Sequence, residues 1–276
     1  MKELVIRRIL IAAGIAFMVV YCLGPFFFMA LVSISSGPDF LDAHRGMEFS
    51  LSSYKSIITS ESLHFLDYLR NSLAISLVTA LATIMVSSPA AYALARTNFP
   101  GKMLLLLAIL AISIFPQISL VGYLFKLMSS LGWINTYQAL ILPYIAWALP
   151  FAVWILTSYF SQIPSDLDKA ALVDGCTRWQ SLHKVIFPVA APGLISALLL
   201  VFIFSLNEFM FALMLTTDYQ ARTIPVGIAL FQGLHGEIPW GEIMAASTLT
   251  VLPVVGLTII FQRRIIRGLT RGAVKE

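Results

Sequence analysis

Charged residues are scarce in this sequence: Asp, Glu, Lys and Arg make up 12% of its 276 residues, whereas 59% are hydrophobic. An average soluble domain carries about a quarter charged residues. The composition therefore excludes an ordinary soluble enzyme and a disordered chain. The mean hydropathy is +0.87, and apolar runs long enough to cross a bilayer, which takes ~20 residues per helix, recur along the chain. We expect an all-α integral membrane protein.

Residues that hold metals or form disulfides are also few, with two cysteines and four histidines. Cys22 lies in the first apolar run and Cys176 in a polar stretch, so the two are expected at different depths, where they cannot pair. The histidines lack the H-E-x-x-H spacing of zinc enzymes. No catalytic residue, metal ligand or cofactor site is therefore assigned. The net charge of +4 is divided among several loops, which argues against nucleic-acid binding.

Six apolar segments are predicted to span the membrane within a single transmembrane domain, residues 1–276. They cover about 9–34, 71–95, 103–128, 137–160, 189–216 and 243–262. Each is long enough to cross a bilayer with some tilt. The first segment is longer than the roughly 7–15-residue apolar core of a signal peptide, so it is interpreted as a retained helix. A polar stretch, residues 161–188, separates the fourth and fifth segments.

The basic residues fall mainly on one side of these spans. Placing the N-terminus in the cytoplasm leaves few of the 18 basic residues outside, namely Arg45, Lys55, Arg70, Lys126 and Arg222. Because cytoplasmic loops carry the excess of Lys and Arg, both termini are predicted to be cytoplasmic. The protein is expected to be a multi-pass protein of the cytoplasmic (inner) membrane, in contact with membrane lipid.

The polar stretch from Ser161 to Pro188 predicts two short helices joined by a turn. Two helix starts have the spacing of capping boxes, Ser165 with Asp168 and Thr177 with Gln180. Asp174-Gly175 is expected to end the first helix, and Pro188 is expected to close the second. The first helix has a face of small and apolar side chains, which would let another protein approach closely: Leu167, Ala170 and Ala171.

This stretch resembles the EAA loop of permease subunits of ABC importers, which docks into a groove of the ATPase subunit. The resemblance implies ATPase-coupling roles for the matching residues, Lys169, Ala170, Ala171, Asp174, Gly175 and Pro188. Lys169 stands where the family usually has glutamate, with Asp168 one position earlier, which puts any specific salt bridge of that glutamate in doubt. The alternative interpretation is a solvated helical linker between two spans.

Further segments carry the resemblance along nearly the whole chain. They include Ala90–Arg96, Asn207-Glu208-Phe209, Ile224-Pro225-Val226-Gly227 and Gln262-Arg263-Arg264. They look like carbohydrate permeases of the maltose-transporter type, and like the MalG-like rather than the MalF-like subunit. The resemblance implies a type I ABC importer permease fold with six transmembrane helices and a cytoplasmic coupling hairpin. It also implies a second, MalF-like permease, an ATPase dimer, an extracytoplasmic sugar-binding protein and a sugar substrate, for which a disaccharide such as trehalose or maltose is expected.

The sequence has no phosphate-binding loop of the form G-x-x-x-x-G-K-[ST]. ATP is therefore expected to be bound and hydrolysed by a separate chain, and this chain to be a transport subunit rather than an enzyme. Two rival functions place different demands on the residues. A secondary transporter is expected to carry an internal repeat and buried ion ligands, and an intramembrane enzyme needs paired acid and base groups at one depth. The residues favour neither.

Two groups of residues are candidates for contacts with the substrate and its carrier. Ser205, Asn207 and Glu208 are candidates for lining the translocation path, because an ionisable residue within a span is costly and usually functional. The alternative places Glu208 near the outer headgroups. In the glycine-rich outer segment 217–242, Gln232 and His235 are candidate contacts for the binding protein, and the alternative there is a simple connector.

Overall fold

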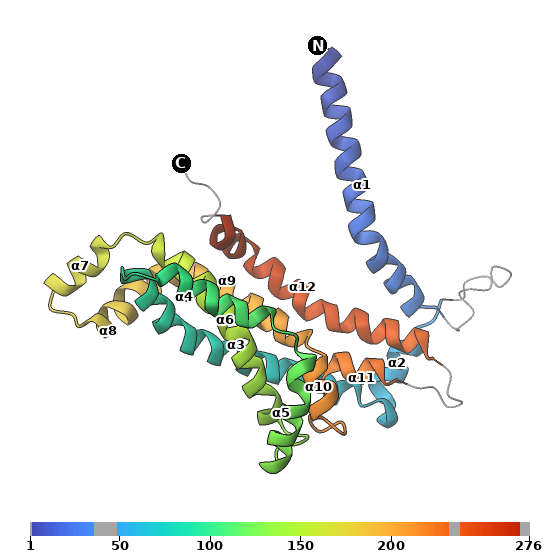
Figure 1. Cartoon of the computed structure of the whole chain (residues 1–276). Coiled ribbons are helices and arrows are strands. Elements are labelled where there is room, and N and C mark those ends of the chain that lie inside the picture. The colour runs from blue at the N-terminus through green and yellow to red at the C-terminus, as the bar shows by residue number, and fades with distance from the viewer. Residues whose placement is uncertain (1, 36–48, 232–237, 271–276) are drawn as a thin grey trace. The chain divides into compact units, whose positions relative to one another are not determined.

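The computed structural model describes residues 2–35, 49–231 and 238–270. Apart from an isolated bridge between Ser35 and Phe49, the regular structure in these ranges is helical, which confirms the all-α prediction. The elements, drawn in Figure 1, are α1 (Lys2–Ser33), α2 (Ser52–Thr59), η2 (Glu61–Leu63), α3 (Phe65–Arg96), α4 (Lys102–Ile114), α5 (Ile118–Ser130), α6 (Tyr137–Ser161), α7 (Asp166–Val173), α8 (Arg178–Ser181), the π turn η3 (Leu182–Ile186), α9 (Phe187–Leu206), α10 (Met210–Leu215), α11 (Ile224–Ala229) and α12 (Trp240–Thr270).

Five helical stretches in the described ranges are long and apolar enough to cross a membrane. They are Ile6–Ser33, Phe65–Arg96, Tyr137–Ser161, Arg178–Leu206 and Trp240–Gln262. The segment predicted as the third span, 103–128, is instead two helices, α4 and α5, bent by 80°. The break follows from Pro116, because the residue before a proline is driven out of the helical region, and Phe115 is extended with ψ 132°. Counting the bent pair as one span gives six.

The chain forms two compact units, which are described separately. Unit 1 comprises Met1–Leu66 and Gly227–Pro253, and unit 2 comprises Asp67–Val226 and Val254–Glu276. In unit 1, Ser33 Oγ and the Tyr54 hydroxyl lie 2.8 Å apart in a hydrogen bond that ties the end of α1 to α2. The long apolar side chains of α1 from Ile6 to Phe28 are exposed. A helix that is apolar all round is expected to face lipid or another subunit.

The core of unit 2 lies where α6 packs against α9. Small buried residues, Ala148 and Ala152 on α6 and Ala190 and Ala197 on α9, let the two backbones approach closely. In Figure 1 the helices α7 and α8 lie at one end of this unit, and α5 and α10 lie at the other. Unit 2 therefore connects a polar hairpin at one end to the start of α10 at the other.

Asn71 fixes the loop that follows α10. Its Nδ2 donates to the backbone oxygens of Tyr219 (2.8 Å) and Arg222 (3.0 Å), and its Oδ1 accepts a hydrogen bond from the Tyr137 hydroxyl. The neighbouring Ser72 Oγ accepts from the N–H of Ile224 at 2.7 Å. Because Asn71 is fully buried, these bonds are shielded from water and are expected to order the loop.

Candidate functional site

The first helix of the hairpin, α7, ends at Val173, and Gly175 follows in the turn. This residue has φ +85°, its N–H donates to Leu172 O at 3.1 Å, and the N–H of Cys176 donates to Ala171 O at 2.9 Å. The two bonds form a Schellman motif, which requires a left-handed residue after the helix. A β-carbon in this conformation costs ~1–2 kcal/mol. The predicted turn at Asp174-Gly175 is confirmed.

The two predicted capping boxes have different outcomes. At the start of α8, Thr177 Oγ1 accepts from the N–H of Gln180 at 3.2 Å, and Gln180 Oε1 accepts from the N–H of Thr177 at 2.8 Å, so this box is confirmed. The prediction for Ser165 was wrong, because its side chain makes no cap hydrogen bond. Ser165 is itself helical, with φ −65° and ψ −16°, and the Asp168 carboxylate is held by other partners.

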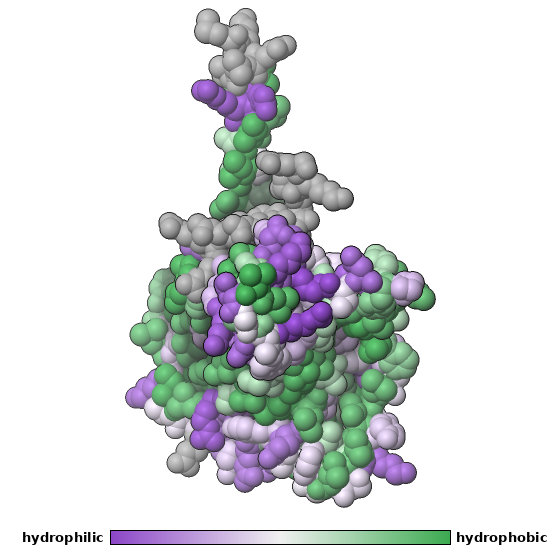
Figure 2. Space-filling model, turned by 90° about the vertical axis from the view of Figure 1, so that its left-hand side faces the viewer, coloured by the Kyte–Doolittle hydropathy of each residue, from purple (hydrophilic) through white to green (hydrophobic). Residues whose placement is uncertain are grey.

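The face of α7 that was predicted to be open to another protein packs in part on this protein itself. Ala171 is buried and Leu167 is half-buried, whereas Ala170 is exposed. The side chains exposed near the tip include the larger Leu172, 45% exposed, and Val173, 87% exposed. Figure 2 views the molecule from the hairpin end and shows hydrophobic residues bordered by hydrophilic ones. The larger apolar side chains on the hairpin surface are therefore ones that the spacing argument did not select.

The other predicted coupling residues lie on the outside of the hairpin. Lys169, Asp174 and Gly175 are exposed, as is Pro188. Lys169 Nζ lies 2.8 Å from Oδ1 of Asp166 in the same helix. This contact lowers the pKa of the Asp166 carboxyl and raises the pKa of the Lys169 ammonium. Both side chains are more than two-thirds exposed, so the pair adds little to stability.

Pro188 does not close the second helix, contrary to the prediction. The N–H of Phe187 donates to Leu182 O, which is a bond to the fifth residue back, and this wider π turn carries the helix from α8 through η3 into α9. The π turn accommodates Pro188, which has no N–H to donate and whose ring would crowd the preceding turn of a regular helix. The hairpin is therefore continuous with a candidate membrane span, Arg178–Leu206.

Glu208 lies in a break between two helices and not inside the fifth helix as predicted. Helix α9 ends at Leu206 and α10 begins at Met210. The carboxylate accepts the N–H groups of Phe211 at 2.9 Å and Ala212 at 3.2 Å, which the first turn of a helix leaves without helical partners. The Glu208 side chain is 6% exposed. It therefore holds the start of α10 in place.

The other residues predicted to line the translocation path or to contact the binding protein do not lie together in one site. Ser205 is buried, and its Oγ has no hydrogen-bond partner among the described residues. Asn207 is exposed, and its Nδ2 donates to Ile203 O at 2.7 Å. Gln232 and His235 lie outside the described residues.

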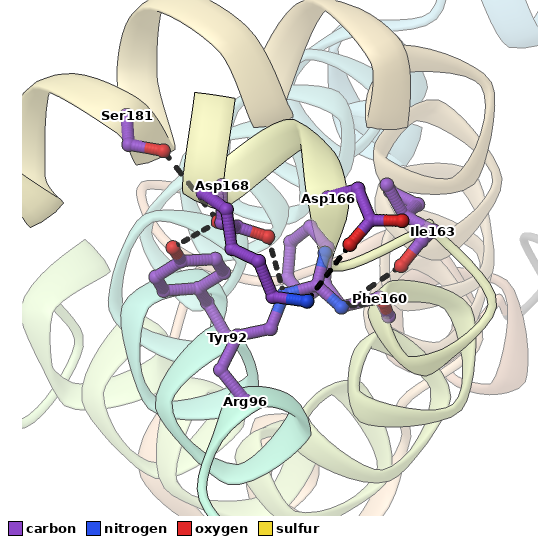
Figure 3. Close-up of polar contacts among 8 residues, drawn as sticks. Tyr92, Arg96, Phe160, Ile163, Asp166, Asp168 and Ser181 are labelled. Atoms are coloured by element: carbon purple, nitrogen blue, oxygen red, sulfur yellow. Dashed lines mark hydrogen bonds and ion pairs between the residues drawn. The ribbon is translucent and has the colours of Figure 1, made fainter. Parts of the chain in front are cut away.

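Sequence reasoning missed a polar cluster that holds α7. Tyr92 and Arg96, both on α3, contact the carboxylate of Asp168 (Figure 3). Arg96, at the end of α3, is part of the Ala90–Arg96 segment noted in the sequence. Its partner Asp168, however, lies more than 70 residues away in the chain. A single sequence offers no signal for a pairing at that separation.

A family model described as "Binding-protein-dependent transport system inner membrane component" matches residues 84–271. This chain belongs to that family. The matched region contains the hairpin, the continuous helix that follows it and the break at Glu208. As a member of this transport family, the chain is an ABC importer permease subunit and not an enzyme.

Several relatives are permease proteins of sugar transport systems. The trehalose/maltose transport system permease protein MalG of Thermococcus litoralis is 52% identical over 277 residues, which cover 100% of this chain and 99% of the relative. The trehalose transport system permease protein SugB of Mycobacterium tuberculosis is 48% identical over 212 residues, which cover 76% of this chain and 77% of the relative.

Solved structures of ABC importers have the same fold as this chain. A chain in the crystal structure of a bacterial ABC transporter that imports the acidic polysaccharide alginate aligns with a TM-score of 0.79 and 19% identity, over 95% of this chain and 98% of that one. A second alginate transporter structure, in complex with a pentasaccharide-bound periplasmic protein, aligns with a TM-score of 0.68 and 17% identity, over 96% of each chain. The type I ABC importer permease fold predicted from the resemblance is confirmed.

Proposed function

We propose that this permease carries a sugar across the cytoplasmic membrane, and that the sugar is a disaccharide such as trehalose or maltose. The observation that supports this most directly is the 52% identity, over the full chain, to a trehalose/maltose permease. The mycobacterial relative is named for trehalose transport. Two relatives from different organisms thus have trehalose in their names, which makes trehalose the first sugar to test.

The 161–188 hairpin is the proposed docking site of a separate ATPase dimer. It presents the apolar side chains of Leu172 and Val173 near its tip, and both of its helix ends are fixed, by the Schellman turn at Gly175 and the capping box at Thr177. A rigid, exposed apolar projection among polar residues suits insertion into a groove of another protein. Since α8 continues into α9, a displacement of the hairpin would move the span as a rigid body.

The proposed orientation places both termini and the hairpin in the cytoplasm, because most basic residues then lie inside. Proposed partners are a second, MalF-like permease and an extracytoplasmic sugar-binding protein. Exposed apolar side chains along α1 and α4 provide surface for lipid and for the second permease. Gln232 and His235 remain candidates for contact with the binding protein.

The translocation path is proposed to pass the break between α9 and α10. Asn207 has the exposed side chain there, and the amide can both donate and accept hydrogen bonds to sugar hydroxyls. Glu208 contributes by holding the break open as the cap of α10. Ser205 lies one turn earlier, buried, and would reach the path only if α9 moved.

The test is uptake by proteoliposomes that contain the complete complex, supplied with binding protein and with ATP inside. Radiolabelled trehalose, maltose, glucose and an amino acid are compared, with and without ATP. ATP-dependent accumulation of trehalose or maltose is expected. Accumulation driven by an ion gradient without ATP would instead support a secondary transporter, and uptake of the amino acid alone would contradict the sugar assignment.

A further inference from the structure

Three helix ends meet at the carboxylate of Asp168, which lies in the first turn of α7. The Tyr92 hydroxyl donates to Oδ1, Nε of Arg96 lies 2.8 Å from Oδ2, and Ser181 Oγ donates to Oδ1 at 3.5 Å. Figure 3 shows the tyrosine and arginine reaching the carboxylate from one helix, α3, while the serine lies on the far side. Asp168 thus joins α3 to both helices of the hairpin.

Arg96 extends this cluster to a fourth helix, α6. Its Nη1 donates to the backbone oxygens of Phe160 at 3.2 Å and Ile163 at 2.9 Å. Phe160 lies in the last turn of α6 and Ile163 lies two residues beyond the end of the helix, where a positive charge is favoured. The guanidinium carbon also lies 5.9 Å from the centre of the Tyr92 ring. One arginine therefore holds the ends of α6 and α7 against the end of α3.

The two ion pairs on α7 differ in how exposed they are to solvent, and therefore in strength. The side chains of Arg96 and Asp168 are 16% and 13% exposed, whereas those of Lys169 and Asp166 are 71% and 83% exposed. An exposed pair contributes little. Removing one partner of a shielded ion pair leaves the other charge unpaired and is far more disruptive. The helix α7 is therefore held through Asp168 and not through the Lys169–Asp166 pair.

We propose that Asp168 is a positioning residue that locks α7 to the ends of α3 and α6. A force applied to the hairpin then moves these two spans as well as α9. The inference rests on the proposed role of the hairpin in ATPase coupling. Without the lock, α7 would be joined to the rest of unit 2 mainly by the chain on either side of it, by the half-buried Leu167 and by the buried Ala171. A displacement of the hairpin would then rotate α7 locally and would not be transmitted to α3 and α6.

The test compares Asp168→Asn with Asp166→Asn in the complete reconstituted complex. Both variants remove one carboxylate charge from α7, but Asp166 has only an exposed partner and is outside the predicted contact residues. Two quantities are measured: the amount of ATPase chain that co-purifies, and the number of sugars transported per ATP hydrolysed. For Asp168→Asn we expect co-purification to be kept and the sugar-to-ATP ratio to fall about tenfold, since hydrogen bonds to charged groups are the strong ones. Asp166→Asn is expected to keep the parental ratio.

Tyr92→Phe and a double-mutant cycle serve as controls that distinguish loss of the lock from a folding defect. Tyr92→Phe removes one hydroxyl and leaves the Arg96–Asp168 pair, so it is expected to lower the ratio by about threefold. Because Arg96 and Asp168 act as one unit, Arg96→Gln combined with Asp168→Asn is expected to be no worse than the worse single variant. An unchanged ratio in Asp168→Asn and Tyr92→Phe, with ATPase bound, would overturn the lock. A parent complex that retains no ATPase would instead contradict the proposed function.

Discussion

The backbone of Gly193 in α9 lies so close to the ring of Tyr159 in α6 that a β-carbon at residue 193 would come within 2.5 Å of the ring. The Gly193→Ala variant is therefore expected to destabilise the protein by ~1–3 kcal/mol through overpacking. The measurement is the thermal unfolding midpoint in detergent.

A matched control is Gly122→Ala in α5, where nothing lies within 4 Å of the added carbon. It is expected to be neutral or slightly stabilising, since Ala favours helix over Gly by up to ~1 kcal/mol. In a Tyr159→Ala background, where the ring is absent, Gly193→Ala should cost less stability than it does in the parent. A Gly193→Ala protein that melts at the parental temperature would show that α6 and α9 are not packed this closely.

Replacing Gly175 by Leu is expected to abolish transport while leaving the protein inserted. The residue has φ +85° and is exposed, so the substitution strains the Schellman turn by ~1–2 kcal/mol and places a large side chain on the proposed docking surface. Uptake and co-purifying ATPase are measured together. Gly132→Leu, at a residue with φ +70° in the loop before α6, carries the same backbone strain away from the hairpin, so it should keep its ATPase. Equal ATPase recovery from both variants would contradict docking at the hairpin.

The Glu208→Ala variant is expected to lose both oxygens that hold the start of α10. Two buried N–H groups would then lack a partner, which we expect to lower stability by ~1–3 kcal/mol. Glu208→Gln keeps one carbonyl oxygen, so its unfolding midpoint should lie between those of Glu208→Ala and the parent. Uptake in Glu208→Ala should fall more than ATPase co-purification, because Glu208 lies at the end of α9 opposite the hairpin. If Glu208→Ala were as stable as the parent, Glu208 would not act as the cap of α10.

Asn71→Ala is expected to loosen the loop that follows α10. The variant removes the donors to Tyr219 O and Arg222 O and the acceptor for Tyr137. Hydrogen exchange of the backbone amides at 217–223 should accelerate at least tenfold, because the loop would open at lower free energy. Asn207→Ala, which loses one exposed bond, should leave exchange in this loop unchanged. Protection that survives in Asn71→Ala would show that Asn135, which binds Asp218, is the anchor instead.

Local signals in the sequence predicted local structure well. The turn at Gly175 and the capping box of Thr177 with Gln180 depend on neighbours within a few residues, and both are confirmed. The apolar runs predicted the helical class for the same reason. Hydropathy alone did not reveal the 80° bend at Pro116, because a proline kink leaves the apolar composition of a segment unchanged.

The remaining features depend on contacts between distant residues. Asp168 has the spacing of a capping-box partner, but Tyr92 and Arg96 hold its carboxylate, and an ion pair with good shielding outweighs a weak local cap. Glu208 was expected within a helix because its neighbours are apolar. Its two backbone partners stabilise a break that no periodicity argument detects.

The most direct test of the proposed coupling is site-specific photocross-linking from Val173 in the complete complex. A photoreactive side chain replaces Val173, 87% exposed at the end of α7, and in a second variant Ile114, 82% exposed at the end of α4. The account predicts a cross-linked product with the ATPase chain from residue 173 and none from residue 114. Its yield should change when ATP is bound, since the hairpin moves with the ATPase. Absence of an ATPase product from residue 173, in a complex that still hydrolyses ATP and transports sugar, would contradict the account.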